Sequence, residues 1–341
     1  MADKTGINWT EATWNPVVGC SIRSPGCRRC YAMKMGRRLE LMGGKGGKKY
    51  AGLTRVVKGK SVWTGEVREH AESIDQPIRW RRPRLIFVNS MSDLFHEKLG
   101  RKAMDRTFAV MAMARQHTFQ ILTKREDVMV GYMEGLQNGM RGFDIVDCQR
   151  EIIGEAAYFR RQKRTDGYGT GFEKPLANVW IGVSVEDQRY ADVRRDALKR
   201  VAALGWKTWV SYEPALGPVD WTGWDFIRCL VSGGESGDDA TPSHPNWHRS
   251  ARDWCAAHGI AYGFKQWGEW APHRARPWGD LGGDVRTGRV RIVHPSARSD
   301  VEISEATGGH STEPGSRYMA RIGKRVAGRL LDGVEHNGIP A

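Results

Sequence analysis

Short apolar runs that end in polar side chains, each followed by a helical pattern, recur along this chain and constrain its fold more than any other feature. Buried strands that alternate with amphipathic helices indicate parallel βαβ units. The sequence therefore predicts an α/β protein, a complete or partial (β/α) barrel of about six to seven parallel strands. No G-x-G-x-x-G follows a strand, so nothing favours a doubly wound dinucleotide-binding sheet. The runs lie at residues 13–18, 84–90, 118–123, 179–184, 208–212, 229–232 and 261–264.

The barrel is predicted to span residues 9–270, with a polar, glycine-containing insertion at about 126–175. The remaining residues, 271–341, are rich in Gly and Arg and weakly patterned, which predicts a small C-terminal addition packed on the barrel. Within it, residues 290–294 are expected to form a strand. The spacing of Tyr318, Ile322, Val326 and Leu330 predicts one face of a last helix.

Polar residues stand where nearly every predicted strand ends, and in (β/α) barrels functional groups gather at that edge. Loops are polar in any protein. The repeated choice of Cys, Glu and Lys in the first loop positions is what predicts a functional rim. The residues concerned are Cys20, Ser92, Asp93, Lys124, Glu186, Glu213, Glu235 and Lys265.

Three cysteines, Cys20, Cys27 and Cys30, lie in one loop at C-x6-C-x2-C spacing, which predicts a metal or cluster site. A structural zinc ion wants four protein ligands, and the loop contains no histidine; His70 or His96 would have to come from elsewhere. An iron–sulfur cluster tolerates three thiolates when a small molecule takes the fourth iron. Cluster, zinc and unliganded thiols all remain open at this point.

The residues after the loop predict an amphipathic helix with Ala32, Met35, Leu39 and Met42 on its apolar face, followed by a flexible basic loop at 43–49. The other three cysteines are isolated, and we predict that they are small buried hydrophobes. They are Cys148, Cys229 and Cys255.

Positive charge concentrates beside the cysteines. The chain of 341 residues has a net charge of +14, and the segment 23–60 contains twelve Lys or Arg and one acid, Glu40. We call residues 23–60 the basic segment. Such a concentration of cations predicts a polyanionic partner, nucleic acid first, although a solvated basic face is the alternative.

The cysteine loop, Gly19-Cys20-x6-Cys27-x2-Cys30-Tyr31-Ala32, resembles that of radical S-adenosylmethionine enzymes, and its ending resembles the spore photoproduct lyase-like branch. The radical-enzyme loop has three residues between its first two cysteines, whereas this one has six. The whole chain resembles a phage- and prophage-associated three-cysteine-motif family of unknown function. The motifs are Trp14-Asn-Pro, Phe87-Val-Asn-Ser-Met-Ser-Asp-Leu-Phe-His96, Leu122-Thr-Lys-Arg125, Trp180-Ile-Gly-Val-Ser-Val-Glu186, Val210-Ser-Tyr-Glu-Pro214, Ser232-Gly-Gly-Glu-Ser236, Phe264-Lys-Gln-Trp-Gly-Glu-Trp270 and Ala327-Gly-Arg-Leu-Leu-Asp-Gly333.

The resemblance implies a [4Fe-4S] cluster on Cys20, Cys27 and Cys30 and S-adenosylmethionine as cosubstrate, cleaved reductively to a 5′-deoxyadenosyl radical with electrons from a donor. The expected substrate is nucleic acid or a nucleotide. The alternatives are a non-catalytic nucleic-acid-binding protein stabilised by Zn, or a phage accessory protein with a structural cluster. Residues expected to hold S-adenosylmethionine, any of which could instead form internal ion pairs, are Ser184, Glu186, Glu213, Ser232, Gly233, Gly234, Glu235 and Lys265.

Two further expectations concern location. The first residues, Met-Ala-Asp-Lys, lack the apolar core of a signal peptide, and no run of about 18 apolar residues could span a membrane. Clustered cysteines suit a reducing compartment. We therefore expect a cytoplasmic protein of the bacterial host that makes no membrane contact.

Overall fold

A computed structural model describes residues 5, 7, 9–138, 142–163, 175–272, 290–296, 304–305 and 314–339 of the chain. It divides into two compact units, one of residues 1–183 and 197–208 and the other of residues 184–196 and 209–341. Each unit is described by itself below. The predicted limits of the barrel, the insertion and the C-terminal addition stay predictions. Residues 164–174 of the insertion and several stretches of the addition lie outside the described residues.

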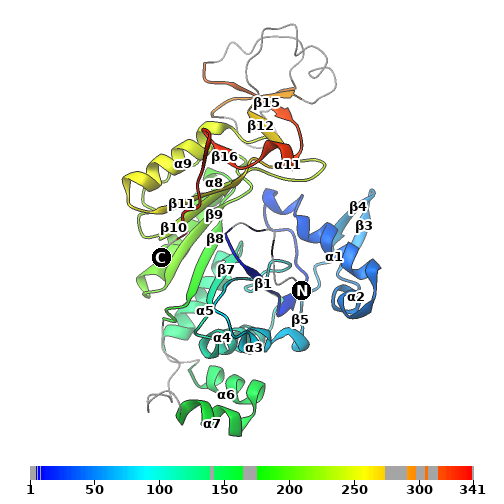
Figure 1. Ribbon diagram of the computed structural model, residues 1–341, viewed down its shortest axis with the longest axis vertical. Helices are drawn as coiled ribbons and strands as arrows, with labels where there is room; N and C mark the ends of the chain where they lie inside the picture. The colour runs from blue at the N-terminus through cyan, green and yellow to red at the C-terminus, as the bar shows by residue number, and fades with distance from the viewer. Residues whose placement is uncertain are drawn as a thin grey trace. The chain divides into compact units, whose positions relative to one another are not determined.

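Seven parallel strands form the main sheet, which confirms the predicted partial (β/α) barrel (Figure 1). Every predicted strand is present. β8 is buried along its whole length, as expected for a strand covered on both faces. The order across the sheet is β1 (Ala12–Trp14), β6 (Leu85–Val88), β7 (Thr118–Thr123), β8 (Val179–Ser184), β9 (Lys207–Tyr212), β10 (Cys229–Gly233) and β11 (Ala261–Gln266).

The first unit contains the parallel pairs β1–β6, β6–β7 and β7–β8. Helix α4 (Arg101–Met113) follows β6, and α5 (Glu126–Gln137) follows β7. The first part of the stretch predicted as an insertion forms α5, which buries Met129, Met133 and Leu136 as a regular helix of the βα rhythm does. Two more helices come after it, α6 (Gly142–Ile153) and α7 (Glu155–Lys163).

Two helices and a hairpin follow the cysteine loop in the sequence. α1 (Tyr31–Met42) begins at the residue after Cys30 and ends before Gly43, as predicted. Its predicted apolar face is right at Ala32, which is buried, and at Leu39, which is partly buried against the core, and wrong at two methionines. Met35 and Met42 are exposed, and the buried residues are Ala32, Met33 and Gly36. The hairpin strands are β3 (Thr54–Val57) and β4 (Lys60–Trp63), which pair in antiparallel fashion. The remaining short elements before β6 are β2 (Val17–Val18), β5 (Arg68–Glu69) and α3 (Gln76–Arg79).

The predicted flexible loop at 43–49 is instead helix α2 (Gly44–Tyr50). Two buried side chains explain the difference, since a packed face can outweigh the low helix propensity of glycine. Tyr50 joins the apolar core, and Lys49 donates from Nζ to the carbonyl of Asn15 at 2.8 Å and to Ser73 Oγ at 3.0 Å. Burial lowers the pKa of Lys49 to about 8.

The second unit contains the parallel pairs β9–β10 and β10–β11, with α9 (Pro245–Ala257) between the last two strands. Most of α8 (Gln188–Ala203) also belongs to it. The four-stranded sheet beyond β11 has the order β12 (Trp270–Pro272), β15 (Arg317–Arg321), β13 (Val290–Val293) and β14 (Ser304–Glu305). The strand expected at 290–294 is thus present.

The predicted last helix is wrong. Tyr318 lies in β15, and the chain then forms a short helix α11 (Lys324–Ala327) and the hairpin β16 (Leu330–Leu331) with β17 (Val334–Glu335). Glycines break the apparent helical spacing, because Gly323 and Gly328 flank α11 with φ of +85° and +69°, a conformation that side-chain-bearing residues avoid. Among the described residues, no helix combines the length and the apolar character needed to cross a bilayer.

Candidate functional site

The cysteine loop leaves β2 through Gly19, whose φ of +87° and close surroundings leave no room for a side chain. A Cβ at this position would stand 2.1 Å from the carbonyl oxygen of Glu66. The loop then forms a 3-10 turn at Pro25–Cys27, and the amide of Cys30 donates to the carbonyl of Cys27 at 3.2 Å. Two of the three thiols are therefore held within one turn of each other.

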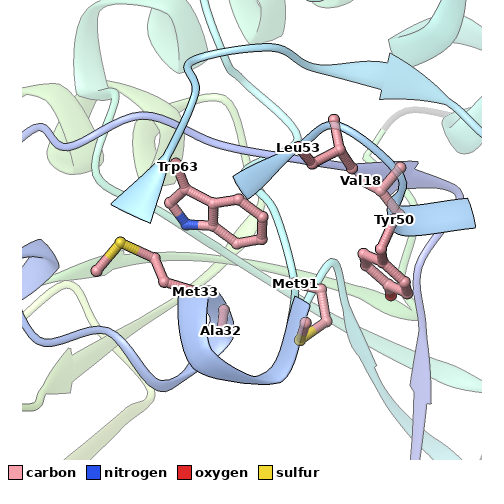
Figure 2. Packing of buried hydrophobic residues seen from close by; sticks show 7 residues of the cluster. All are labelled: Val18, Ala32, Met33, Tyr50, Leu53, Trp63 and Met91. Atoms are coloured by element: carbon pink, nitrogen blue, oxygen red, sulfur yellow. The ribbon is translucent and has the colours of Figure 1, made fainter. Parts of the chain in front are cut away.

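An apolar cluster lies under this loop and includes Trp63 of the hairpin (Figure 2). We call it the Trp63 cluster. Cys20 and Cys30 both pack against it, although nine residues, Cys27 among them, separate them in the sequence. Helix α1 approaches closely because Gly36 has no side chain; a Cβ there would be 3.1 Å from Trp63. The members of the cluster are Val18, Ala32, Met33, Tyr50, Leu53, Trp63 and Met91.

The thiols of Cys27 and Cys30 act electrostatically on the thiol of Cys20. Burial raises the pKa of Cys20 to about 12; Arg125 opposes this, while Asp93 and the neighbouring thiols of Cys27 and Cys30 raise the pKa further. All three cysteines are reduced and half-buried. Within the described residues, no three His, Cys, Asp or Glu side chains already stand in the arrangement of a metal site. By type the three thiol donors fit a cluster ligated by thiolates.

A buried arginine holds the beginning of this loop. Arg125 follows β7 and donates from Nη2 to the carbonyl of Ser21 at 3.2 Å and to Ser21 Oγ at 2.8 Å. Its Nη1 is 3.0 Å from Asp93 Oδ2, and its Nε is 2.6 Å from Glu97 Oε2. Asp93 also accepts from Thr123 Oγ1 at 2.7 Å. The residue after Cys20 is thereby fixed to the ends of β6 and β7.

His96 lies beside Ser21 but is a poor zinc ligand. Its Nδ1 accepts from the amide of Lys98 at 3.1 Å, so the proton of the neutral ring is on Nε2. Nε2 in turn is 2.8 Å from Ser21 Oγ. Binding a metal through Nε2 would break this bond and displace that proton. The arrangement favours three thiol donors over a Cys3His site.

In the second unit, the ends of three strands bring Glu213, Gly233 and Lys265 together. Lys265 Nζ lies 2.8 Å from Glu213 Oε1 and 2.9 Å from Oε2, with both side chains largely buried. A Cβ on Gly233 would be 3.5 Å from the Glu213 carboxyl carbon. These three predicted residues form one group, and their role toward a cofactor stays a prediction.

Glu186 and Ser184 are engaged elsewhere in that unit. Arg194 of α8 donates from Nη1 to Glu186 Oε2 at 2.7 Å and to the carbonyl of Ser184 at 2.6 Å. The side chains of Glu186 and Arg194 are fully buried. The main role of a carboxylate in such a pair is structural, because leaving either charge buried and unpaired costs about 3–5 kcal/mol.

Ser232 belongs to a buried polar network. Its Oγ is 2.6 Å from the Tyr262 hydroxyl and 3.1 Å from His248 Nδ1, and His248 Nε2 is 2.8 Å from Ser243 Oγ. Burial lowers the pKa of His248 to about 3. These four side chains satisfy one another, so the predicted ligand role of Ser232 would compete with existing hydrogen bonds.

The glycine turn after β10 is packed against the segment after β11. A Cβ on Gly234 would stand 2.0 Å from the carbonyl oxygen of Trp267, and the amide of Gly234 donates to Gln266 at 2.9 Å. Glu235 Oε2 accepts from the amide of Thr241 at 2.8 Å. The glycine pair therefore allows the backbone after β10 to pack directly on the backbone after β11.

Sequence reasoning missed Arg125, Arg194 and His248 as site residues. Arg125 stands two positions beyond a predicted strand, so its place at the rim was available as a signal. Arg194 lies on α8 among charged residues, where periodicity favours an exposed side chain. His248 lies on α9, and nothing in its sequence neighbourhood marks it. The isolated Cys148, Cys229 and Cys255 are buried, as predicted.

Comparison with known proteins gives one family match. The model of the family described as "Protein of unknown function (DUF5131)" matches residues 4–340. No curated protein matches the chain.

Among solved structures, the chain is similar to variants of spore photoproduct lyase. One variant with bound AdoMet and dinucleoside spore photoproduct is 12% identical, with a TM-score of 0.37, over 92% of this chain and 69% of that one. A second is 10% identical, with a TM-score of 0.38, over 73% and 74%. A third is 12% identical, with a TM-score of 0.33; the match covers 66% of this chain and only 56% of that protein. Likeness at this level carries no argument about activity.

Proposed function

We propose that this chain, which belongs to the DUF5131 family of proteins of unknown function, is a radical S-adenosylmethionine-type iron–sulfur enzyme that acts on nucleic acid or a nucleotide. The observation that supports the proposal best is that Cys20, Cys27 and Cys30 lie in one anchored loop. Cys20 and Cys30 pack on one apolar cluster, and the amide of Cys30 donates to the carbonyl of Cys27 at 3.2 Å.

The residues of the loop would hold a [4Fe-4S] cluster by their three thiolates. When bound, such a cluster with one open iron binds S-adenosylmethionine and supplies the electron for its reductive cleavage. Arg125 holds Ser21, the residue after Cys20, by two hydrogen bonds. Its buried guanidinium would offset part of the negative charge of the thiolates. The Trp63 cluster covers part of the side chains of Cys20 and Cys30 and would give a bound cluster an apolar surrounding on that side.

Glu213, Gly233 and Lys265 are the residues we expect to contact S-adenosylmethionine. The Lys265 ammonium would pair with its carboxylate, Glu213 would accept from its ammonium, and Gly233 would allow a close backbone approach. An external electron donor is required, and a reducing cytoplasm would keep the thiols reduced.

The nucleic-acid part of the proposal rests on the basic segment. Several of its exposed cations make no ion pair with any described residue, and a cation without an internal partner remains available for phosphates. They are Arg38, Lys45, Lys48, Arg55 and Lys58. Arg37 and Lys49 are not among these available cations, because Arg37 pairs with Glu40 at 2.9 Å and Lys49 is buried.

Anaerobic reconstitution tests the cluster directly. We expect about four iron atoms per chain, an electron paramagnetic resonance signal that shifts when S-adenosylmethionine is added, and 5′-deoxyadenosine once a reductant is present. Serine at Cys20, Cys27 or Cys30 should abolish iron binding. Serine at the buried Cys148, Cys229 or Cys255 provides the matched control and should leave the iron content unchanged. Colourless protein with one zinc ion per chain would reject the proposal in favour of a zinc-stabilised binding protein.

A further inference from the structure

We propose that the hairpin β3–β4 is a DNA-binding element that enters the major groove of a duplex. The inference deepens the proposed function, on which it rests for the choice of nucleic acid as partner. It assigns the contact to one rigid part of the basic segment and one form of nucleic acid.

The root of the hairpin is anchored in the apolar core. Thr54 and Trp63 are opposite each other in the pairing and both are buried. Trp63 belongs to the Trp63 cluster, and the amide of Thr64 donates to the carbonyl of Leu53 at 2.9 Å. Helix α1 also packs on β3 and β4. The hairpin therefore has a fixed orientation on its unit.

The outer half of the hairpin is exposed from residue 55 to residue 60. Its tip is a two-residue turn with positive φ at both positions, 48° at Lys58 and 75° at Gly59. Such turns match the twist of the two strands and give a compact, rigid hairpin. The element thus has the form of a rigid two-stranded ribbon with one fixed end and one free end.

The side chains of this free end are basic and apolar, with no acid. No Asp or Glu occurs between Glu40 and Glu66 in the sequence. Arg55, Val57 and Lys60 share one face, because alternate residues of a strand point to the same side and Val57 is the partner of Lys60. Val56 is 57% and Val57 is 42% exposed. A face that merely solvates the protein has no need of an exposed valine such as Val57.

This combination complements the major groove of B-form DNA. The groove is about 12 Å wide and admits a two-stranded ribbon. Arg55 and Lys58 would contact phosphates on its walls, and Val57 would contact a thymine methyl group on its floor. Because the hairpin root and the thiols of Cys20 and Cys30 share the Trp63 cluster, DNA bound there would be rigidly connected to the cysteine loop.

The test compares two double variants of the full chain that lose the same charge. Arg55→Gln with Lys58→Gln removes two hairpin cations; Lys199→Gln with Lys207→Gln removes two exposed cations elsewhere in the same unit. Affinity for a short labelled DNA duplex is measured by fluorescence anisotropy over a series of salt concentrations, after thermal melts show that the variants are folded. We expect the hairpin variant to bind at least 10-fold more weakly and to lose about 1.8 from the slope of log K against log salt, about 0.9 per phosphate contact. The control should keep both values.

Several results would overturn the inference. They are absence of duplex binding by the natural chain, equal losses in the two double variants, or binding to single-stranded DNA or duplex RNA as tight as to duplex DNA, since the major groove of RNA is too deep and narrow. Iron content and the effect of S-adenosylmethionine on the paramagnetic signal report on the proposed enzyme separately. Either proposal can therefore fail while the other stands.

Discussion

Arg125 donates to both the carbonyl and the hydroxyl of Ser21, 104 positions earlier in the chain. The end of β7 therefore fixes the first residues of the cysteine loop. The same guanidinium is paired with Asp93 and Glu97. Burial raises the pKa of Glu97, but hydrogen bonds from the backbone and from Arg125 outweigh it and lower the value to about 2. The loop is thus attached to a charged network as well as to an apolar cluster.

We predict that Arg125→Gln lowers the free energy of unfolding by about 3 kcal/mol, because it leaves Asp93 buried without its cationic partner. Denaturant titration of the apo chain measures this loss. The variant should also lose reconstituted iron faster to a chelator, since Ser21 is released. Arg79→Gln is the control; it breaks an exposed pair with Asp75 and should cost less than about 1 kcal/mol. Equal losses in the two variants would contradict the role given to Arg125.

Alanine at Gly19 should be far more harmful than alanine at Gly52. Both residues have positive φ, +87° and +73°, which costs a side-chain-bearing residue about 1–2 kcal/mol. At Gly52 nothing lies within 4 Å of the new Cβ, whereas at Gly19 it meets the Glu66 carbonyl oxygen at 2.1 Å. We expect Gly19→Ala to lose at least about 2 kcal/mol more than Gly52→Ala and to displace the cysteine loop. Thermal melts and iron content would reveal both effects, and similar behaviour of the two variants would show that the close approach is absent.

Substitution of Glu186 and of Glu213 should distinguish a structural role from a role in binding S-adenosylmethionine. Glu186→Gln removes the partner of the buried Arg194 and should cost about 3–5 kcal/mol. Glu213→Gln removes the partner of the less buried Lys265 and should cost clearly less. If Glu213 contacts S-adenosylmethionine, equilibrium dialysis with the reconstituted protein should show at least 10-fold weaker binding for Glu213→Gln. Unchanged affinity would remove Glu213 from the proposed site.

Acid should destabilise the fold through His248. Burial lowers the pKa of His248 to about 3, below its ordinary value of 6.5, and the charges of His244 and Arg249 act in the same direction. Between these values the unfolded chain binds a proton that the folded chain does not. Stability is therefore lost as the pH falls from 6.5, by about 2 kcal/mol at pH 5 from this residue alone. Denaturation at pH 7.5 and pH 5 should show this loss in the natural chain, and a smaller one in His248→Gln. Identical pH dependence of the two proteins would contradict the prediction.

Sequence periodicity predicted the βα part of the fold well, because buried parallel strands are continuous apolar runs with polar ends. It failed where tertiary packing outweighed local pattern. α2 forms in a glycine-rich stretch because Lys49 and Tyr50 are buried, and the supposed last helix is divided by Gly323 and Gly328. On α1, the apolar side chains do not define one face by their spacing alone. Met33 is buried, whereas Met35 and Met42, which the spacing favoured, are exposed.

The candidate site was partly predictable for a similar reason. The strand-end rule identified Glu213 and Lys265, which meet as a pair. It could not tell that Glu186 is paired with Arg194 or that Ser232 bonds to Tyr262 and His248. Those partners lie on helices and neighbouring strands, where the sequence gives the side-chain type but not its direction.

The buried Lys49 gives the basic segment an internal reference for chemical footprinting. An amine-reactive probe should modify the exposed Lys45 and Lys48 while sparing Lys49, whose ammonium is enclosed by Asn15 and Ser73. Mass spectrometry of a single peptide would then distinguish a bound partner, which shields Lys45 or Lys48, from opening of the local structure, which exposes Lys49. The same measurement would thus distinguish binding of a partner to the basic segment from local unfolding of that segment.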